Sequence, residues 1–121
     1  MIKLTKQQMK EKDQIAAWLD GKPFKKNSRD KDPQVPVLSV EDVLNTYTPQ
    51  YISDGGKFYT PLLMSEEFVG HLNIFTGMQI LDPCAGIGNL LFPVYANSVK
   101  IDAIELDEEA CKIGSKLFPD V

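Results

Sequence analysis

Residues 79–91 read QILDPCAGIGNLL, in which a short apolar run leads into two glycines one residue apart. The run at residues 79–82 is bounded by turn residues, which predicts a short buried strand. Glycines between a strand and a helix let a ligand approach the backbone closely, as we expect at Gly86 and Gly88. The apolar residues that follow predict a helix that Asn89 opens.

A second strand and helix follow this loop. Residues 99–106 carry apolar side chains that predict a strand, and Asp107 is placed to cap a helix that runs to Leu117. The order strand, loop, helix, strand, helix forms a βαβ unit, in which a right-handed crossover makes the two strands parallel neighbours. We therefore expect an α/β fold. Residues 119–121 stand where a third strand would begin, so we expect a partner chain, self-association or a truncation to account for the missing strands.

Three helices are predicted before the first strand. Thr5 and Gln8 have the spacing of a capping box, which predicts a helix from there to Asp20. Ser39 is placed to cap a short helix that ends before Pro49.

A proline also starts the third of these helices. Pro61 suits the start of a helix whose apolar residues continue to Phe75. Between the first two helices, residues 21–36 are polar with three prolines and predict a loop. We accordingly divide the chain into an N-terminal helical and basic segment with a linker, residues 1–50, and a second part, residues 51–121.

Composition excludes several classes of protein. The 121 residues are 43% hydrophobic and 25% charged, which is typical of one globular domain or part of a larger one. No apolar run is long enough to span a bilayer and the first residues resemble no secretion signal, so we expect a cytoplasmic protein without membrane contact. The two cysteines form no Cys-x-x-Cys pair and His71 is the single histidine, so we expect no metal site.

Charge is distributed unevenly along the chain. Residues 1–31 hold nine basic and four acidic residues, whereas residues 32–121 hold four and thirteen. The basic residues gather towards the end of the first segment, at Lys22, Lys25, Lys26, Arg29 and Lys31. Such a cluster fits either a contact with nucleic acid or a solvated, charged linker.

Two acidic residues flank the glycine loop. Asp82 would repel a pyrophosphate, and Leu91 stands where a dinucleotide-binding loop wants a small residue. An acid at this place attracts a cation instead, such as the ammonium and sulfonium of S-adenosylmethionine. Glu105 ends the second strand, where its carboxylate can accept both hydroxyls of a ribose. The alternatives are a simple Asp-Pro turn and an exposed carboxylate, but together with the loop the two acids predict a nucleoside site.

Three motifs resemble the S-adenosylmethionine-dependent DNA methyltransferases that modify the exocyclic amine of adenine. DPCAGIGNLL, residues 82–91, is similar to their first motif, and IDAIELDEEA, residues 101–110, is similar to their second. GKFYTP, residues 56–61, resembles the Phe-Tyr-Thr-Pro stretch that lies against the methionine end of their cofactor.

The resemblance implies a Rossmann-like methyltransferase fold, of which the first βαβα portion is present, preceded by N-terminal helices. It also implies that S-adenosylmethionine is the cofactor and that its methionine part is held at the first motif, its ribose at Glu105 and its other side by the Tyr59 segment. The predicted cofactor-binding residues are Tyr59, Thr60, Pro61, Asp82, Pro83, Ala85, Gly86, Gly88, Asn89 and Glu105.

The family's catalytic segment, (Asp/Asn/Ser)-Pro-Pro-(Tyr/Phe), occurs nowhere in the 121 residues, so no catalytic residue is predicted. We expect the N-terminal cofactor-binding part of a DNA (adenine) methyltransferase, with a restriction-modification system as one setting. DNA is the expected partner of the complete enzyme, and a second chain or a second copy would complete the sheet. The alternatives are part of an RNA or protein methyltransferase and a non-catalytic binding or assembly module; whether the chain is itself an enzyme stays open.

Overall fold

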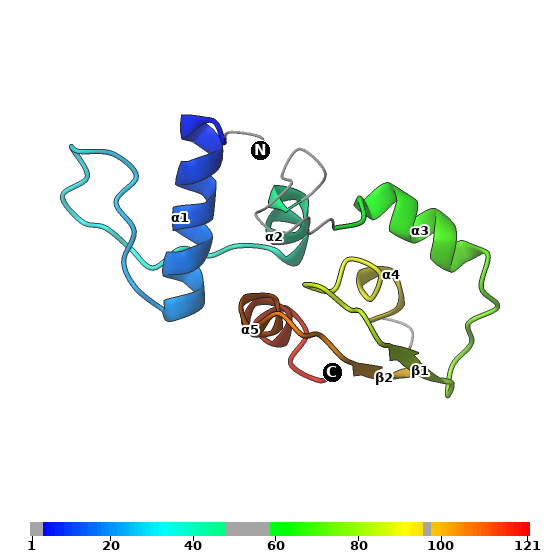
Figure 1. Cartoon of the computed structure of the whole chain (residues 1–121). Helices are drawn as coiled ribbons and strands as arrows, with labels where there is room; N and C mark the ends of the chain where they lie inside the picture. Colours follow the sequence, from blue (N-terminus) through cyan, green and yellow to red (C-terminus); the bar gives the residue numbers. More distant parts are fainter. Residues whose placement is uncertain (1–3, 48–58, 96–97) are drawn as a thin grey trace.

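The computed structural model describes residues 4–47, 59–95 and 98–121. Its elements follow in the order α1 (Lys6–Asp20), α2 (Val40–Thr46), α3 (Leu62–Gly70), β1 (Gln79–Asp82), α4 (Phe92–Tyr95), β2 (Lys100–Ala103) and α5 (Glu108–Leu117). Figure 1 shows the strands below α3 and α4, with α1 at the opposite end and α2 and α5 in between. The chain is thus a mixed helical and β structure, as the α/β prediction requires.

The two strands pair in parallel, as the βαβ order predicts. Gln79 lies opposite Lys100, and Asp82 lies opposite Ala103. The backbone N–H of Ile104 still donates to the carbonyl of Asp82, at 2.9 Å. Beyond that point the Cys84 N–H donates to the Asp82 carboxylate instead of to β2, and the Ile104 carbonyl accepts from the Ala85 N–H at 3.0 Å. The regular pairing stops there, so β2 ends before the predicted limit at residue 106.

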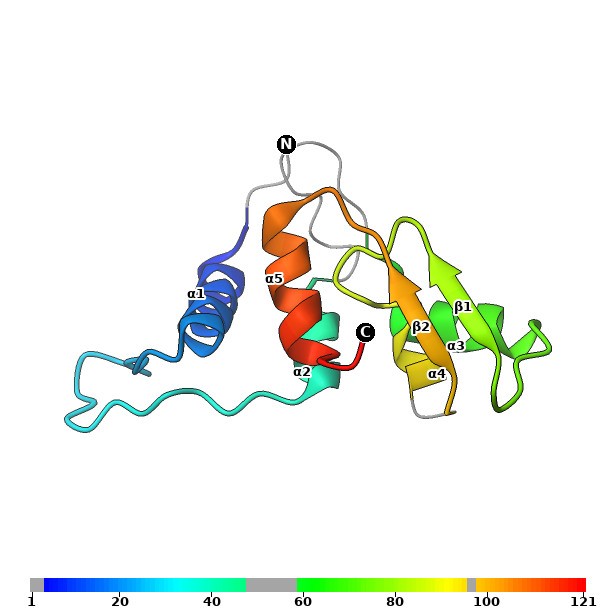
Figure 2. The ribbon, with the colours of Figure 1, turned by 90° about the horizontal axis from the view of Figure 1, so that it is seen from below.

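One face of this small sheet is packed against other parts of the chain, and the other face is exposed. Ile80 and Ile101 lie opposite one another and pack with Leu91 and Val94 of the following loop and helix. Leu81, one residue along and therefore on the other face, leaves 58% of its surface exposed. Figure 2 views the sheet from below, with the strands in front of α3 and α4, so the described helices cover one face.

The predicted N-terminal helices are present with their caps. Thr5 and Gln8 form the full capping box at the start of α1, and the Ser39 hydroxyl accepts from the Asp42 N–H at the start of α2. Buried Trp18 anchors α1 on α5, where the Lys116 ammonium lies 4.4 Å from the centre of its ring and donates to its carbonyl.

One buried cluster unites these helices with the glycine loop. Val43 and Leu44 of α2 are fully buried, and they share a core with Ile87 of the loop and Ile113 of α5. The predicted boundary between two parts of the chain, near residue 50, lies outside the described residues. This core fixes the position of the loop, because Ile87 can be buried only with the loop folded against α5.

The helix predicted from Pro61 to Phe75 is shorter than expected. α3 ends at Gly70, and Leu72 and Phe75 lie beyond it with 46% and 65% of their surfaces exposed. Even Phe68, within the helix, is 54% exposed. The apolar spacing therefore did not mark a buried stripe here, and Gly70, a poor helix former, falls at the end of the helix.

The helix after the loop begins later than predicted. α4 starts at Phe92, with Pro93 in its first turn, whereas Asn89 was expected to open it. Two tight turns intervene, in which the carbonyl of Gly88 accepts from the N–H groups of Leu91 and Phe92. Asn89 caps no helix, because its side-chain oxygen accepts no backbone N–H among the described residues. Residues 21–36 form the predicted loop. None of the helices in the described part of the chain could span a bilayer.

Candidate functional site

The glycine loop takes a conformation that other residues adopt with strain. Gly86 has φ of 57° and Gly88 has φ of 102°, both in the left-handed region. A Cβ at Gly88 would lie 2.3 Å from the ring of Phe118, and one at Gly86 would lie 3.0 Å from the ring of Tyr59. The sequence predicts that these glycines admit a ligand; in the structure the spaces beside their Cα atoms are taken by two aromatic rings of the chain itself.

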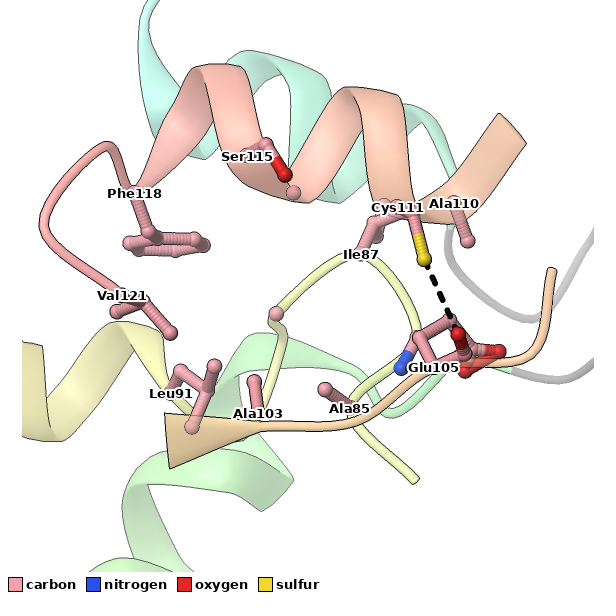
Figure 3. Close-up of a pocket in the computed structure, with 13 residues that line it drawn as sticks. Ala85, Ile87, Leu91, Ala103, Glu105, Ala110, Cys111, Ser115, Phe118 and Val121 are labelled. Atoms are coloured by element: carbon pink, nitrogen blue, oxygen red, sulfur yellow. Dashed lines mark hydrogen bonds between the residues drawn. The ribbon is translucent and has the colours of Figure 1, made fainter. Parts of the chain in front are cut away.

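Glu105 closes the loop from the side of β2. Its two carboxylate oxygens accept hydrogen bonds from the backbone N–H of Gly86, at 3.2 Å, and of Asp107, at 3.4 Å. The Cys111 thiol donates to the Glu105 carbonyl at 3.1 Å, as drawn in Figure 3. The structure thus brings the predicted ribose-binding acid into contact with the glycine loop, across 19 residues of sequence.

A cavity of about 110 Å³ lies between the glycine loop and α5. Figure 3 shows Glu105 at one end and Phe118 with Val121 at the other, below helix α5. Four predicted site residues line it: Ala85, Gly86, Gly88 and Glu105. Pockets that bury small ligands usually enclose about 300–1,000 Å³, so this cavity has room for only part of a nucleoside.

The Tyr59 segment meets the loop from another side. The Asn89 amide donates to the carbonyl of Thr60 at 2.8 Å, a bond between residues 29 apart in sequence. Tyr59 stacks edge-on against Tyr47 at the end of α2, with ring centres 5.8 Å apart. Pro61 precedes the first turn of α3 as its cap. Two motifs that lie far apart in the sequence are therefore in direct contact, and Phe58 of the same stretch lies outside the described residues.

Asn89 itself is buried, with 4% of its surface exposed. Its amide nitrogen is bonded to Thr60, but its side-chain oxygen Oδ1 is buried with no hydrogen-bond donor among the described residues. An unpaired buried acceptor is costly, so a group that donates to Oδ1 would be stabilised there.

Asp82 and Pro83 lie at the start of the loop, away from the residues that line the cavity. The Asp82 carboxylate accepts from the Cys84 N–H at 3.0 Å and so forms the predicted Asp-Pro turn. Within the described residues, neither Asp82 nor Glu105 pairs with a Lys or Arg side chain. The end of the sheet therefore carries two carboxylates without a bound cation of the chain, which favours a positively charged ligand.

Asp107 takes the capping role that the sequence predicts for it. The Asp107 carboxylate accepts from the Ala110 N–H at 3.0 Å and caps α5. His71 is exposed at the end of α3, and Cys84 is exposed beside the loop. The described residues include no group of three or more His, Cys, Asp or Glu side chains placed to hold a metal ion.

Sequence reasoning missed the α5 side of the cavity. Cys111, Gly114 and Ser115 of this helix line it, together with Phe118 just beyond the helix. These positions recur three or four residues apart, so they share one helix face. The sequence displays this spacing. The spacing alone could not indicate that this face of α5 lines a cavity beside the loop, because a helix face that packs in the core has the same spacing.

A family model described as N-6 DNA methylase matches residues 39–112, which include the loop, both strands and the first half of α5. Neither the curated proteins nor the solved structures gave a match.

Proposed function

The chain belongs to the N-6 DNA methylase family, and from this we propose that it is the cofactor-binding N-terminal part of a cytoplasmic S-adenosylmethionine-dependent DNA (adenine) methyltransferase. The family uses S-adenosylmethionine in general and acts on DNA. The finer proposal is that residues 51–121 form the first βαβα portion of a Rossmann-like domain and that residues 1–50 precede it as a separate segment. We assign no catalytic residue to this chain.

One observation carries the proposal: the glycine loop, Glu105 and the Tyr59 segment are joined by hydrogen bonds and contacts. Glu105 accepts from Gly86, and Asn89 donates to Thr60. A mere Asp-Pro turn or an exposed strand-end carboxylate would need no such convergence. The arrangement supports a site in which Glu105 binds the ribose hydroxyls and the loop and Tyr59 segment enclose the methionine part.

The chemistry of these residues fits the cofactor. Asp82 and Glu105 supply negative charge at the end of the sheet, and the cofactor carries both an ammonium and a sulfonium group. Bound S-adenosylmethionine would supply the methyl group; the chain's own part is to bind and orient it. Because the cavity beside Glu105 is small, we expect most of the cofactor to lie over the loop rather than within that cavity.

The test is calorimetric titration of the 121-residue chain with S-adenosylmethionine. Glu105→Ala removes the carboxylate that would accept the ribose hydroxyls, and we expect the loss of about 1.5–3 kcal/mol to weaken binding about 10- to 150-fold. Asp13→Ala is the matched control, because it removes an exposed carboxylate of α1 and should leave affinity unchanged. Circular dichroism establishes that each variant is folded.

Absence of binding by the folded chain would contradict the proposal, and so would equal affinity of the Glu105→Ala variant. If that variant unfolds, Glu105→Gln keeps the size of the side chain and removes its charge. We expect it also to bind more weakly than the Asp13→Ala variant, because a neutral amide is a poorer acceptor for ribose hydroxyls.

The proposal that DNA is the substrate is tested with the complete enzyme. A restriction-modification role predicts that the complete enzyme protects a DNA site from cleavage by an accompanying endonuclease, and that methyl groups appear on adenine. Transfer to RNA or protein with none to DNA would favour the alternative substrates.

A second proposal, an assembly role, is favoured by the uncovered face of the sheet. Leu81 lies on that face opposite Asp102, with 58% of its surface exposed. Ile104 and Leu106 follow β2 and are 57% and 97% exposed. We propose that a second copy of the chain covers this apolar surface. Light scattering after size exclusion should show a dimer that Leu81→Lys dissociates; a monomer at all concentrations would contradict it.

A further inference from the structure

A hairpin of basic residues extends from the end of α1. It comprises residues 22–34, which we call the basic hairpin, and it is closed by an antiparallel bridge between Phe24 and Gln34. The Phe24 N–H donates to the Gln34 carbonyl at 3.0 Å. Figures 1 and 2 both show this segment projecting from the molecule on the side of α1 that faces away from the sheet.

The hairpin is ordered by its own acidic side chain. The two carboxylate oxygens of Asp30 accept from the backbone N–H groups of Lys26 and Asp32, each at 3.2 Å. The Asn27 side chain accepts from the Arg29 N–H at 2.8 Å. Asp30 is therefore used to fold the turn, and the structure records no ion pair between it and a neighbouring cation.

The basic side chains are left available to a partner. Within the described residues none of the five forms an ion pair, and all are exposed: Lys22, Lys25, Lys26, Arg29 and Lys31. Against them the hairpin holds Asp30 and the exposed Asp32. A charged linker that serves solubility alone would not need a closed turn whose acid bonds to the backbone instead of to these cations.

The rest of the chain is a poor surface for a polyanion. Residues 32–121 hold thirteen acidic and four basic residues, so they repel phosphate. Any contact of this chain with a duplex must therefore come from the basic N-terminal segment, and the hairpin is its most exposed and most densely basic part.

We propose that the basic hairpin binds the phosphate backbone of duplex DNA beside the target site. This rests on the proposed function, because membership in a DNA-modifying family makes DNA the polyanion at hand. The hairpin presents its cations on a turn rather than on a helix fitted to a groove, so it positions the duplex without reading its sequence. It lies at the far end of the molecule from the glycine loop, and its contacts would accordingly fall on DNA that flanks the target base.

The test is fluorescence anisotropy of a short labelled DNA duplex of arbitrary sequence, titrated with the full 121-residue chain. With five phosphates neutralised, the logarithm of the association constant should fall against the logarithm of salt concentration with a slope of up to about −4.5 between about 50 and 200 mM NaCl. Scrambling the duplex sequence should leave the affinity unchanged.

Lys25, Lys26 and Arg29, each replaced by Gln, form the diagnostic variant, and the slope should become less steep by about one for each cation removed. Lys6, Lys10 and Lys100, each replaced by Gln, form the matched control. These three are exposed outside the hairpin and give the same change of net charge. The control should keep the slope of the wild type.

Equal loss in both variants would overturn the proposal, since it would show an effect of net charge alone. Binding independent of salt, or no binding at the lowest salt, would also overturn it. So would tighter binding to an RNA duplex of the same sequence, which would make RNA the partner. The proposed cofactor site is tested separately, because the hairpin variant should still bind S-adenosylmethionine as the wild type does.

Discussion

Gly88 is constrained both by its backbone conformation and by the aromatic ring packed beside it. Its φ of 102° disfavours any side chain, and a Cβ would meet the buried ring of Phe118 at 2.3 Å. Since the ring is itself part of the core, it cannot swing away freely. The loop is therefore shaped by the core beneath it as well as by any ligand above it.

We predict that Gly88→Ala lowers the free energy of unfolding by about 2–5 kcal/mol, because a left-handed alanine costs about 1–2 kcal/mol and overpacking about 1–3. Gly77→Ala is the control: Gly77 has φ of 90°, but nothing lies within 4 Å of its Cβ position. It should show only the conformational part, about 1–2 kcal/mol. Denaturant unfolding of both variants measures the difference, and equal losses would contradict a clash with Phe118.

Asn89 links the loop to the segment that precedes α3. We predict that Asn89→Ala destabilises the chain by about 1–3 kcal/mol, because the part-buried carbonyl of Thr60 loses its donor. Asn73→Ala, at an exposed position, should change stability by less than about 0.5 kcal/mol. Urea unfolding measures both. A neutral Asn89→Ala would mean that the bond to Thr60 does not hold the two segments together.

Among the elements, α1 depends on a single large anchor. Trp18 is buried to 9% exposure between α1 and α5, with Lys116 over its ring. We predict that Trp18→Ala costs about 3–5 kcal/mol, the usual range for a buried aromatic, and that amide hydrogen exchange in α1 accelerates. Met9→Ala on the same helix, 48% exposed, should leave exchange nearly unchanged. Unaltered protection of α1 in the Trp18 variant would show that other contacts hold the helix.

The elements also differ in how far local sequence specified them. α1, α2 and α5 begin at the residues that their caps predict, because a cap is a contact between residues three apart. The predicted end of α3 and the predicted start of α4 were wrong. Their limits depend on Gly70 and on the turns after Gly88, and hence on bonds that the sequence pattern does not display.

For the whole molecule, the main buried cluster predicts cooperative unfolding. It joins α1 and α2 to the loop and α5, so none of these parts has a core of its own. We predict a single transition, in which Trp18 fluorescence and far-ultraviolet ellipticity change at the same denaturant concentration. Separate transitions would show that residues 1–47 unfold independently of the remainder.

The sequence alone was sufficient for the parallel strand pair, the caps of α1, α2 and α5, and the family resemblance. All of these depend on neighbours in the chain or on a fixed order of elements, and such signals survive in a linear pattern. The fold was needed to bring Asn89 to Thr60, to place Phe118 against Gly88 and to turn one face of α5 towards the loop. These contacts join residues far apart in the chain, and their geometry is set by the packing of helices around one core, which no local pattern encodes.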